Sequence, residues 1–388
     1  MILKLRRRLA VVSVLLLAIA AITIVKVQSS DAVVVRASAI KAAVALHAQS
    51  GNGLSAALDP ALAQEQPPVT DKAPEPLIPP PSRQLRVVLD WYPTPYHAPL
   101  IVARERDLFD REGLDVSLIT PADPSVSPKL VAAQRAELAL TSQPQLHFLV
   151  EQGLPLVRVG TLVPAPLATL LTRQDGGIER LAQLKGKTIG YVHANLAHMW
   201  LDALLRDQPI GPEDITLRHI DFALISALVD GEVDAVIGTM RHVSKQQLAQ
   251  QGVEATEFMV EESDLATYDE LILVANRDVL NQHRRDIAGF LDAVEKATLW
   301  LINHPDQGWE LLRRAEPGLD TLANARAWPN VLRYLALRPI ALQQQRYQRL
   351  ETYLLRRGLI ETAAPVERLA TDIGNELPQD NRTAAKNF

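Results

Sequence analysis

Cysteine is absent from this 388-residue chain. The absence excludes disulfides, cysteine metal ligands, cysteine nucleophiles and the residue that carries the lipid of many bacterial surface proteins. Aromatic residues make up only 5% of the chain, and none precedes Trp91. The formal net charge is −5, without a basic cluster in the body of the chain. Nucleic-acid binding depends on basic surface, so we expect no nucleic-acid partner.

Several catalytic signatures are missing as well. The chain has no G-x-S-x-G elbow, phosphate-binding loop, dinucleotide fingerprint or H-E-x-x-H metal motif. His193 and His198 lie five residues apart in an expected loop and do not have metal-ligand spacing. We therefore expect no catalytic residue, no metal and no cofactor.

The N-terminus indicates a membrane-associated segment. Lys4 and residues 6–8 form a cationic flank, and an uncharged run of residues 9–25 follows it. Residues 1–29 are thus either an uncleaved anchor in the inner membrane or a signal peptide cleaved after Ser29. Because the cationic flank stays in the cytoplasm, the rest of the chain would be exported. Residues 30–84 are predicted to be a linker, with eight prolines between residues 59 and 81.

From residue 85 onward, strand-like and helix-like segments alternate, which predicts an α/β fold with mainly parallel sheets. The expected strands cover residues 85–90, 114–120, 136–142, 154–163, 188–192, 215–222, 234–239 and 270–280. We expect one lobe from residues 85–174 and 273–365, a second lobe from residues 175–272, and a polar tail over 366–388. Two chain crossings, near 171–176 and 271–276, would form a hinge, and a cleft between hinged lobes closes on a ligand.

The stretch LDWYPTPYHAPLIVARERDLFDREG, residues 89–113, is the strongest site signal. Trp91 and Tyr96 offer flat apolar faces at the end of a strand, where ligands bind in open α/β sheets. Asp90 and His97 add hydrogen-bonding groups that could orient a ligand. These residue types together suit a flat, nitrogen-bearing ring. The structural alternatives are core packing for the two rings, a turn or helix cap for Asp90, and a buried structural role for His97.

Other strand ends supply further candidates. Gln143 and Gln145 follow the third strand, and their amides can both donate to and accept from a heterocycle. In the second lobe, candidates that follow strands are Tyr191, Asn195 and Arg241. At the returning hinge, candidate acceptors for an amino group are Tyr268, Asp269 and Glu270. The alternative for Arg241 and for the hinge acids is salt bridging between the lobes.

An ordered set of segments resembles bacterial periplasmic substrate-binding proteins for thiamine-pyrimidine precursors (hydroxymethylpyrimidine and formylaminopyrimidine). The segments are LDWYPTPYHAPLIVARERDLFDREGLDV, PADPSVSPKLVAAQRAELALTSQPQL, EQGLPLVRVGTLV, LKGKTIGYV, LVDGEVDAVIGTMR and YDELILVANRDVL, and the match runs from about residue 85 to 362. The resemblance implies a type II periplasmic-binding-protein fold that delivers its ligand to the permease and ATPase subunits of an ABC importer. It also implies a periplasmic or extracytoplasmic location.

The chain departs from this family in two respects. If residues 1–29 stay uncleaved, an N-terminal helix and the proline-rich spacer replace the usual cleaved signal or lipidated cysteine. In addition, residues 193–198 replace a small, glycine- and serine-rich turn, which leaves fewer flexible backbone N–H groups to hold a phosphate or carboxylate.

Three alternatives to the importer hypothesis remain. The protein could be a membrane-tethered sensory protein, a binding protein for another ligand (riboflavin, a sulfonate or nitrate), or a pyrimidine-precursor synthase. The synthases of this family use a cysteine-rich segment, which this chain lacks.

Overall fold

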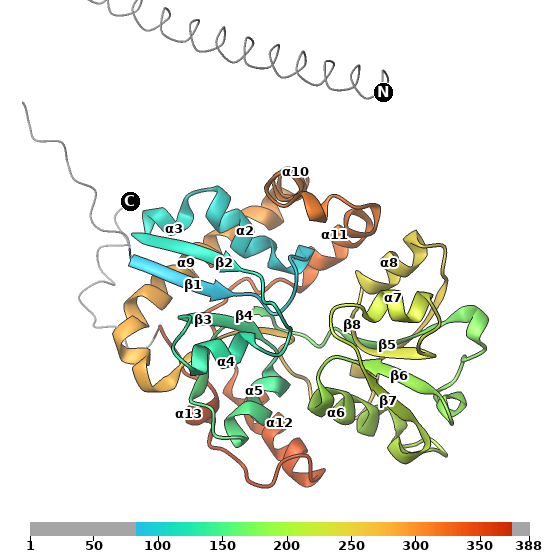
Figure 1. The fold of residues 1–388 in the computed structure, drawn as a ribbon. Coiled ribbons are helices and arrows are strands. Elements are labelled where there is room, and N and C mark those ends of the chain that lie inside the picture. The colour runs from blue at the N-terminus through green and yellow to red at the C-terminus, as the bar shows by residue number, and fades with distance from the viewer. Residues whose placement is uncertain (1–82, 375–388) are drawn as a thin grey trace, which may run out of the picture. The chain divides into compact units, whose positions relative to one another are not determined.

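The structure is a computed structural model that describes residues 83–374. The predicted membrane segment, all but the last two residues of the predicted linker, and residues 375–388 of the predicted tail lie outside the described residues. The described part contains two five-stranded sheets, each with its own helices (Figure 1). Within residues 83–374, no helix has the length and apolar character needed to cross a bilayer.

The first sheet forms the centre of lobe 1. Its strand order is β2 (Leu114–Ile119), β1 (Arg83–Val88), β3 (Leu138–Thr141), β10 (Leu271–Asn276) and β4 (Leu156–Val163). Side chains alternate between two cores, because successive strand residues point to opposite faces. Leu271 and Leu273 join one core, whereas Ile272 and Val274 join the other.

Helices cover both faces of this sheet. The face of Leu271 packs against α2 (Ala98–Glu105), α3 (Leu108–Arg111), α9 (Leu280–Asn303), α10 (Pro305–Ala315) and α11 (Leu322–Tyr334). The face of Ile272 packs against α4 (Ser127–Ala132), α5 (Gln143–Glu151), α12 (Gln344–Arg356) and α13 (Val366–Leu369). Asp107 adopts a left-handed conformation and separates α2 from α3.

The second sheet forms lobe 2. Its order is β7 (Thr216–His219), β6 (Thr188–Tyr191), β8 (Ala235–Met240), β5 (Ala168–Arg173) and β9 (Ala255–Met259). Helix α6 (Ala194–Leu205) covers one face, and α7 (Leu224–Val229) and α8 (Ser244–Gln250) cover the other. Residues 194–198, expected to be loop, are the first turn of α6, whose apolar face buries Leu196, Ala197 and Met199.

The chain crosses between the lobes twice. The first crossing lies between β4 and β5, and the second between β9 and β10. Each crossing leads into the one antiparallel strand of the sheet that it enters; the remaining strands are mutually parallel. The mainly parallel, two-lobed α/β fold expected from the sequence is therefore confirmed.

The lobe boundaries differ from those expected. Strand β5 belongs to the second sheet, so the first crossing is at residues 164–167 and not near 171–176. The second crossing ends before β10 begins at Leu271. Strand β5 is as apolar as β4, so the sequence does not indicate that the chain enters the second lobe there. The only local sign of the crossing is the pair Pro164 and Pro166.

Part of the expected polar tail belongs to lobe 1. Helix α13 packs on the lobe 1 sheet, and Ala370 forms a parallel bridge with Arg158. Leu369 and Ile373 are fully buried. The apolar residues of this short segment are too few to give a periodic signal in the sequence.

Candidate functional site

A cavity of about 690 Å³ lies between the two lobes. It is lined by segments that follow the carboxyl ends of β1, β3, β6 and β8, and by the crossing segment before β10. Ligands bind at this edge of α/β sheets, because the loops after parallel strands converge there. The volume is in the range that holds a drug-sized molecule.

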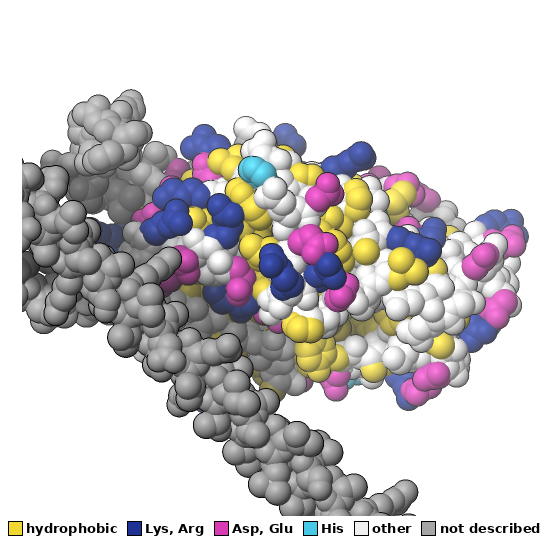
Figure 2. All heavy atoms as spheres, turned by 90° about the horizontal axis from the view of Figure 1, so that it is seen from above, with side chains coloured by type: hydrophobic (Ala, Val, Ile, Leu, Met, Phe, Trp, Pro, Cys, Tyr) yellow, Lys and Arg dark blue, Asp and Glu magenta, His cyan; other side chains and the backbone are white. Residues whose placement is uncertain are grey.

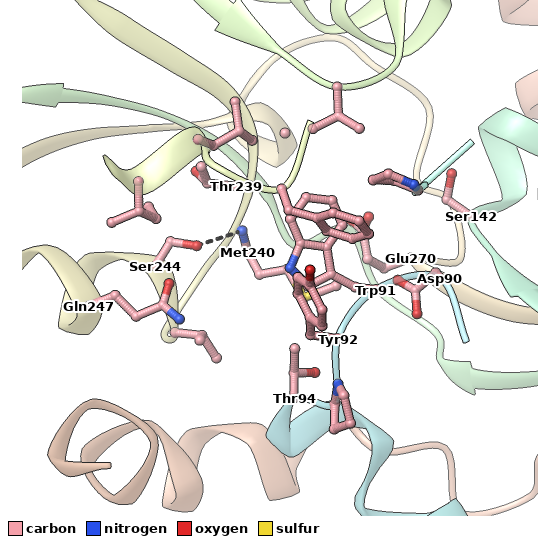
Figure 3. Close-up of a pocket in the computed structure, with 18 of the residues that line it drawn as sticks. Asp90, Trp91, Tyr92, Thr94, Ser142, Thr239, Met240, Ser244, Gln247 and Glu270 are labelled. Atoms are coloured by element: carbon pink, nitrogen blue, oxygen red, sulfur yellow. Dashed lines mark hydrogen bonds between the residues drawn. The ribbon is translucent and has the colours of Figure 1, made fainter. Parts of the chain in front are cut away.

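Aromatic rings from both lobes line the cavity. Trp91 and Tyr92 follow β1 in lobe 1, and Phe222 follows β7 in lobe 2. The Phe222 ring centroid lies 4.6 Å from that of Trp91 and 4.4 Å from that of Tyr92. Trp91 is half-buried, so part of its ring surface is open to the cavity (Figure 3). The rings therefore connect the lobes and also offer a stacking surface.

Replacing Phe222 with alanine is expected to weaken ligand binding by about 3- to 10-fold, because aromatic pairs contribute roughly 0.5–1.5 kcal/mol beyond their buried area. The variant loses the ring contact between the lobes, and we expect ligand binding to be coupled to that contact. Calorimetric titration of the variant measures the change. Unchanged affinity would show that the contact between the lobes does not support binding.

Asp90 faces the cavity and is held by His97. His97 Nε2 lies 2.8 Å from Asp90 Oδ1, and His97 Nδ1 accepts a hydrogen bond from the Thr94 backbone N–H at 2.8 Å. Because Nδ1 is an acceptor, the ring proton is assigned to Nε2, which donates to Asp90. His97 is fully buried and does not line the cavity, so it positions Asp90 instead of contacting a ligand as the sequence suggested.

Glu270 is the second acid of the cavity and joins the two crossing segments. Its Oε2 accepts hydrogen bonds from the backbone N–H groups of Leu167 and Ala168 at 2.6 and 3.1 Å, and its own N–H donates to Val163 O at 3.0 Å. Burial raises the pKa of Glu270 to about 7, although the two backbone donors favour the ionised form. A ligand bound to Glu270 would therefore act on the hinge directly.

The cavity is rich in acceptors and poor in positive charge. Among the described residues that line it, Asp90 and Glu270 are the only charged side chains, because burial lowers the pKa of His193 to about 4 and keeps that ring neutral. Gln145 Oε1 is buried without a hydrogen-bond partner in the described part of the chain. Such a site favours a ligand that donates hydrogen bonds and carries no negative charge.

Trp200 and Gly238, which sequence reasoning missed, also line the cavity. Gly238 has φ of +85°, and a Cβ added there would lie 2.6 Å from the Trp200 ring. The glycine therefore lets the ring lie against β8. Trp200 Nε1 donates to Tyr268 Oη at 3.1 Å, which fixes the ring.

The structure places four of the twelve predicted site residues in the cavity lining: Asp90, Trp91, Gln145 and Glu270. The other eight do not line it: Tyr96, His97, Gln143, Tyr191, Asn195, Arg241, Tyr268 and Asp269. Most of them hold the lining residues or the hinge in place.

Gln143 and Asp269 fasten the second crossing segment to lobe 1. The Asp269 N–H donates to Gln143 Oε1 at 2.9 Å, and the Gln143 N–H donates to Asp269 O at 3.0 Å. The Asp269 carboxylate pairs with Arg346 and accepts from Thr161. Both side chains are thus occupied by structural bonds, and they fix the backbone next to Glu270.

Tyr96, Arg241 and Tyr268 are buried links behind the cavity. Tyr96 Oη donates to Arg241 O at 3.1 Å, which joins lobe 1 to the end of β8. The Arg241 guanidinium pairs with Glu261 at 2.7 Å, so it bridges residues within lobe 2. Burial raises the pKa of Tyr268 well above its usual range, and the neutral phenol accepts from Trp200.

Tyr191 and Asn195 lie on lobe 2 away from the cavity lining. The Tyr191 ring packs edge-on against His219, with centroids 5.6 Å apart. Asn195 lies in the first turn of α6. The next two positions after Tyr191, Val192 and His193, line the cavity instead.

The lining residues that were not predicted from the sequence have little in their sequence context that indicates a binding site. Phe222 and Met240 end strand-like runs, so the strand-end rule that selected Trp91 could have selected them. Ser244, Gln247 and Asn324 lie on helices, with no sequence pattern that distinguishes them from surface residues. Within residues 83–374, no group of three or more His, Asp or Glu side chains is arranged to hold a metal ion.

Comparison with known proteins gives a consistent set of relatives. The profile of the family described as "NMT1/THI5 like" matches residues 94–308. A Haemophilus influenzae protein named for thiamine biosynthesis is 38% identical over 291 residues, 75% of this chain and 92% of that protein. The formylaminopyrimidine-binding protein of Halalkalibacterium halodurans is 30% identical over 228 residues, 59% of this chain and 69% of that protein.

An enzyme and a sulfonate-binding protein are also similar. A 4-amino-5-hydroxymethyl-2-methylpyrimidine phosphate synthase of Saccharomyces cerevisiae is 27% identical over 237 residues, 58% of this chain and 69% of the enzyme. Among solved structures, the alkanesulfonate-binding protein of Xanthomonas axonopodis pv. citri, bound to MOPS, matches with a TM-score of 0.60 and 18% identity. That match covers 75% of this chain and 99% of the other. At this identity the structural match establishes the fold and not the ligand.

Proposed function

Because the chain belongs to the NMT1/THI5-like family, we propose that it is the substrate-binding component of an ABC importer. It captures a thiamine pyrimidine precursor, or a similar neutral heteroaromatic molecule, between its lobes. The observation that carries this proposal is the cavity itself. An exposed face of Trp91 lies in a lining with two carboxylates, Asp90 and Glu270, and no lysine or arginine among its described residues.

An aminopyrimidine suits this arrangement. Its flat ring stacks on an aromatic face, and its exocyclic amino group donates hydrogen bonds to carboxylate oxygens. Gln145 Oε1 offers one more acceptor. The relative named as a formylaminopyrimidine-binding protein supports the same ligand class. The absence of cations from the described lining disfavours sulfonate and nitrate, two of the alternatives considered above.

The two-lobed, hinged architecture supports the proposed transport role. Ligand contacts on both lobes stabilise the closed form. The permease and ATPase subunits can distinguish the bound protein from the free protein only if the two differ in conformation. The proposal places the domain outside the cytoplasm, tethered to the inner membrane through residues 1–29. Acidic and basic side chains are interspersed on the face shown in Figure 2, which supports a small-molecule ligand more than nucleic acid.

We propose a non-catalytic role. The family includes the pyrimidine phosphate synthases named above, but the resemblance implies a cysteine-rich segment for those enzymes, and this chain has no cysteine. A tethered sensory protein would use the same cavity; it differs in its partner and not in its ligand.

Thermal unfolding of the full-length chain tests the ligand class. Hydroxymethyl-aminopyrimidine and its formylated aminomethyl analogue are expected to raise Tm with increasing concentration, as binding to the folded state alone requires. Nitrate and taurine should leave Tm unchanged. A shift with riboflavin alone, or with none of these compounds, would contradict the proposed ligand.

A further inference from the structure

The cavity continues beyond the aromatic and acidic residues into a second compartment of different chemistry. We define the amide compartment as Ser244, Gln247, Gln251, Thr321 and Asn324. Figure 3 shows Ser244 and Gln247 on the opposite side of Trp91 from Glu270 and Ser142. A cavity of about 690 Å³ has room for more than one substituted ring, so a ligand on Trp91 leaves this compartment to be filled.

One wall of the amide compartment comes from lobe 2. Ser244, Gln247 and Gln251 are spaced by three and four residues and therefore share one face of α8 and its end. Ser244 Oγ accepts from the Met240 N–H at 3.1 Å, which leaves its hydroxyl proton to donate (Figure 3). No side-chain hydrogen bond joins Gln247 to another described residue, so its amide can both donate to and accept from a ligand.

The opposite wall comes from lobe 1, at the start of α11. Thr321 Oγ1 accepts from the Asn324 N–H at 3.1 Å, and Asn324 Nδ2 donates to Leu319 O at 3.1 Å. These bonds orient both side chains before any ligand arrives and leave Asn324 Oδ1 as an acceptor. Because α8 packs against α11, a ligand group in this compartment would touch both lobes.

The compartment contains no charged side chain among its described residues. Arg241, the cation at the end of β8, pairs with Glu261 at 2.7 Å and does not line the cavity. A phosphate or carboxylate here would lose its water without gaining an opposite charge. Hydroxyl and amide groups would instead find donors and acceptors on both walls.

We propose that the physiological ligand carries a neutral, hydrogen-bonding extension on its ring, and that this extension occupies the amide compartment, with Gln247 as a specificity-determining residue. This inference rests on the proposed function and narrows it. It names the substrate class as uncharged aminopyrimidines bearing a hydroxyl- or amide-rich substituent, not phosphorylated ones.

A ring series that differs only in its extension tests the inference. The probes are an aminomethyl-aminopyrimidine acylated with formyl, hydroxyacetyl, dihydroxypropanoyl or succinyl groups. Each is titrated by calorimetry into the full-length chain. The hydroxylated members should bind about tenfold more tightly than the formyl compound, as one or two new neutral hydrogen bonds provide. The anionic succinyl member should bind at least about tenfold more weakly.

Variants separate this inference from the proposed function. Gln247→Leu should reduce the affinity ratio between the hydroxylated and formyl members from about tenfold to about one. Gln246→Leu, on the same helix but outside the cavity lining, should behave as the wild type. If the series binds with equal affinity, or Gln247→Leu has no effect on it, the inference is wrong while the proposed function stands. If no pyrimidine binds at all, the proposed function fails, and the inference fails with it.

Discussion

Replacing Trp91 with alanine is expected to weaken aminopyrimidine binding by about 100-fold, because stacking of a nucleic-acid-type base on an aromatic side chain contributes roughly 1–3 kcal/mol. Trp91 is half-buried and follows β1, and its contacts include the Phe222 ring of the other lobe. The variant therefore loses the stacking face and one contact between the lobes. Calorimetric titration with hydroxymethyl-aminopyrimidine measures the loss.

Two controls make this result interpretable. Trp91→Phe keeps a flat ring and should recover most of the affinity. The Tm of the ligand-free Trp91→Ala variant should stay close to that of the wild type, because Trp91 is not among the fully buried core residues. Full affinity in Trp91→Ala, or an unfolded variant, would refute a stacking role for this residue.

Replacing Glu270 with glutamine is expected to lower the affinity for aminopyrimidines by about 10- to 100-fold, since hydrogen bonds to a charged group contribute roughly 1.5–3 kcal/mol. The amide keeps one oxygen that can accept from Leu167 and Ala168, so the junction of the two crossings survives. The loss should be largest above pH 7, where the wild-type carboxylate is ionised, and should shrink as pH falls. Equal affinity at pH 8 would exclude Glu270 as a ligand contact.

The same variant should change the pH dependence of stability. The pKa of Glu270 is raised from 4.5 to about 7 on folding, so the folded chain holds this proton more tightly than the unfolded chain. The contribution to stability is complete below about pH 4.5 and is lost as pH rises through 7. We therefore expect ligand-free Glu270→Gln to be more stable than the wild type at pH 8, by about 3 kcal/mol at most, and to match it below about pH 4.

His193 acts in the opposite direction. Its pKa falls to about 4 on folding, so it adds stability as pH rises from about 4 to 6.5. The pH dependence of the free energy of unfolding of the wild type therefore contains contributions from both groups. The difference in this free energy between the wild type and Glu270→Gln contains the contribution of the Glu270 carboxyl alone. Urea unfolding at several pH values gives this difference. A difference that does not vary with pH would contradict the raised pKa.

Much of the fold could be predicted from the sequence, because its signals are local. Short apolar runs bounded by polar residues located β1, β2, β3, β4 and β10. The lobe boundaries could be predicted less well. Strand β5 is as apolar as β4, so the sequence does not show that the two strands belong to different sheets. A strand also has the same pattern of apolar residues whether its partner is parallel or antiparallel. The start of α6 was not predicted, because His193 and Asn195 are residue types common in loops.

The candidate site could be predicted only where chemistry and strand ends coincide. Asp90, Trp91 and Glu270 follow or precede strands and line the cavity. Tyr96, only five residues beyond Trp91, turns inward because the Pro95–His97 turn directs it into the core, where it is fully buried. Residues such as Gln247 and Asn324 reach the cavity through the packing of α8 on α11, and contacts between distant segments leave no local pattern.

We expect the cavity between the lobes to bind a neutral aminopyrimidine through Trp91, Asp90 and Glu270. Calorimetric titration of the full-length chain with hydroxymethyl-aminopyrimidine and with its phosphate ester tests it most directly. We expect one-to-one binding of the unphosphorylated compound and binding of the ester at least about 100-fold weaker, because no described cation lines the cavity to receive the phosphate. No heat of binding with the unphosphorylated compound, or equal affinity for the ester, would contradict it.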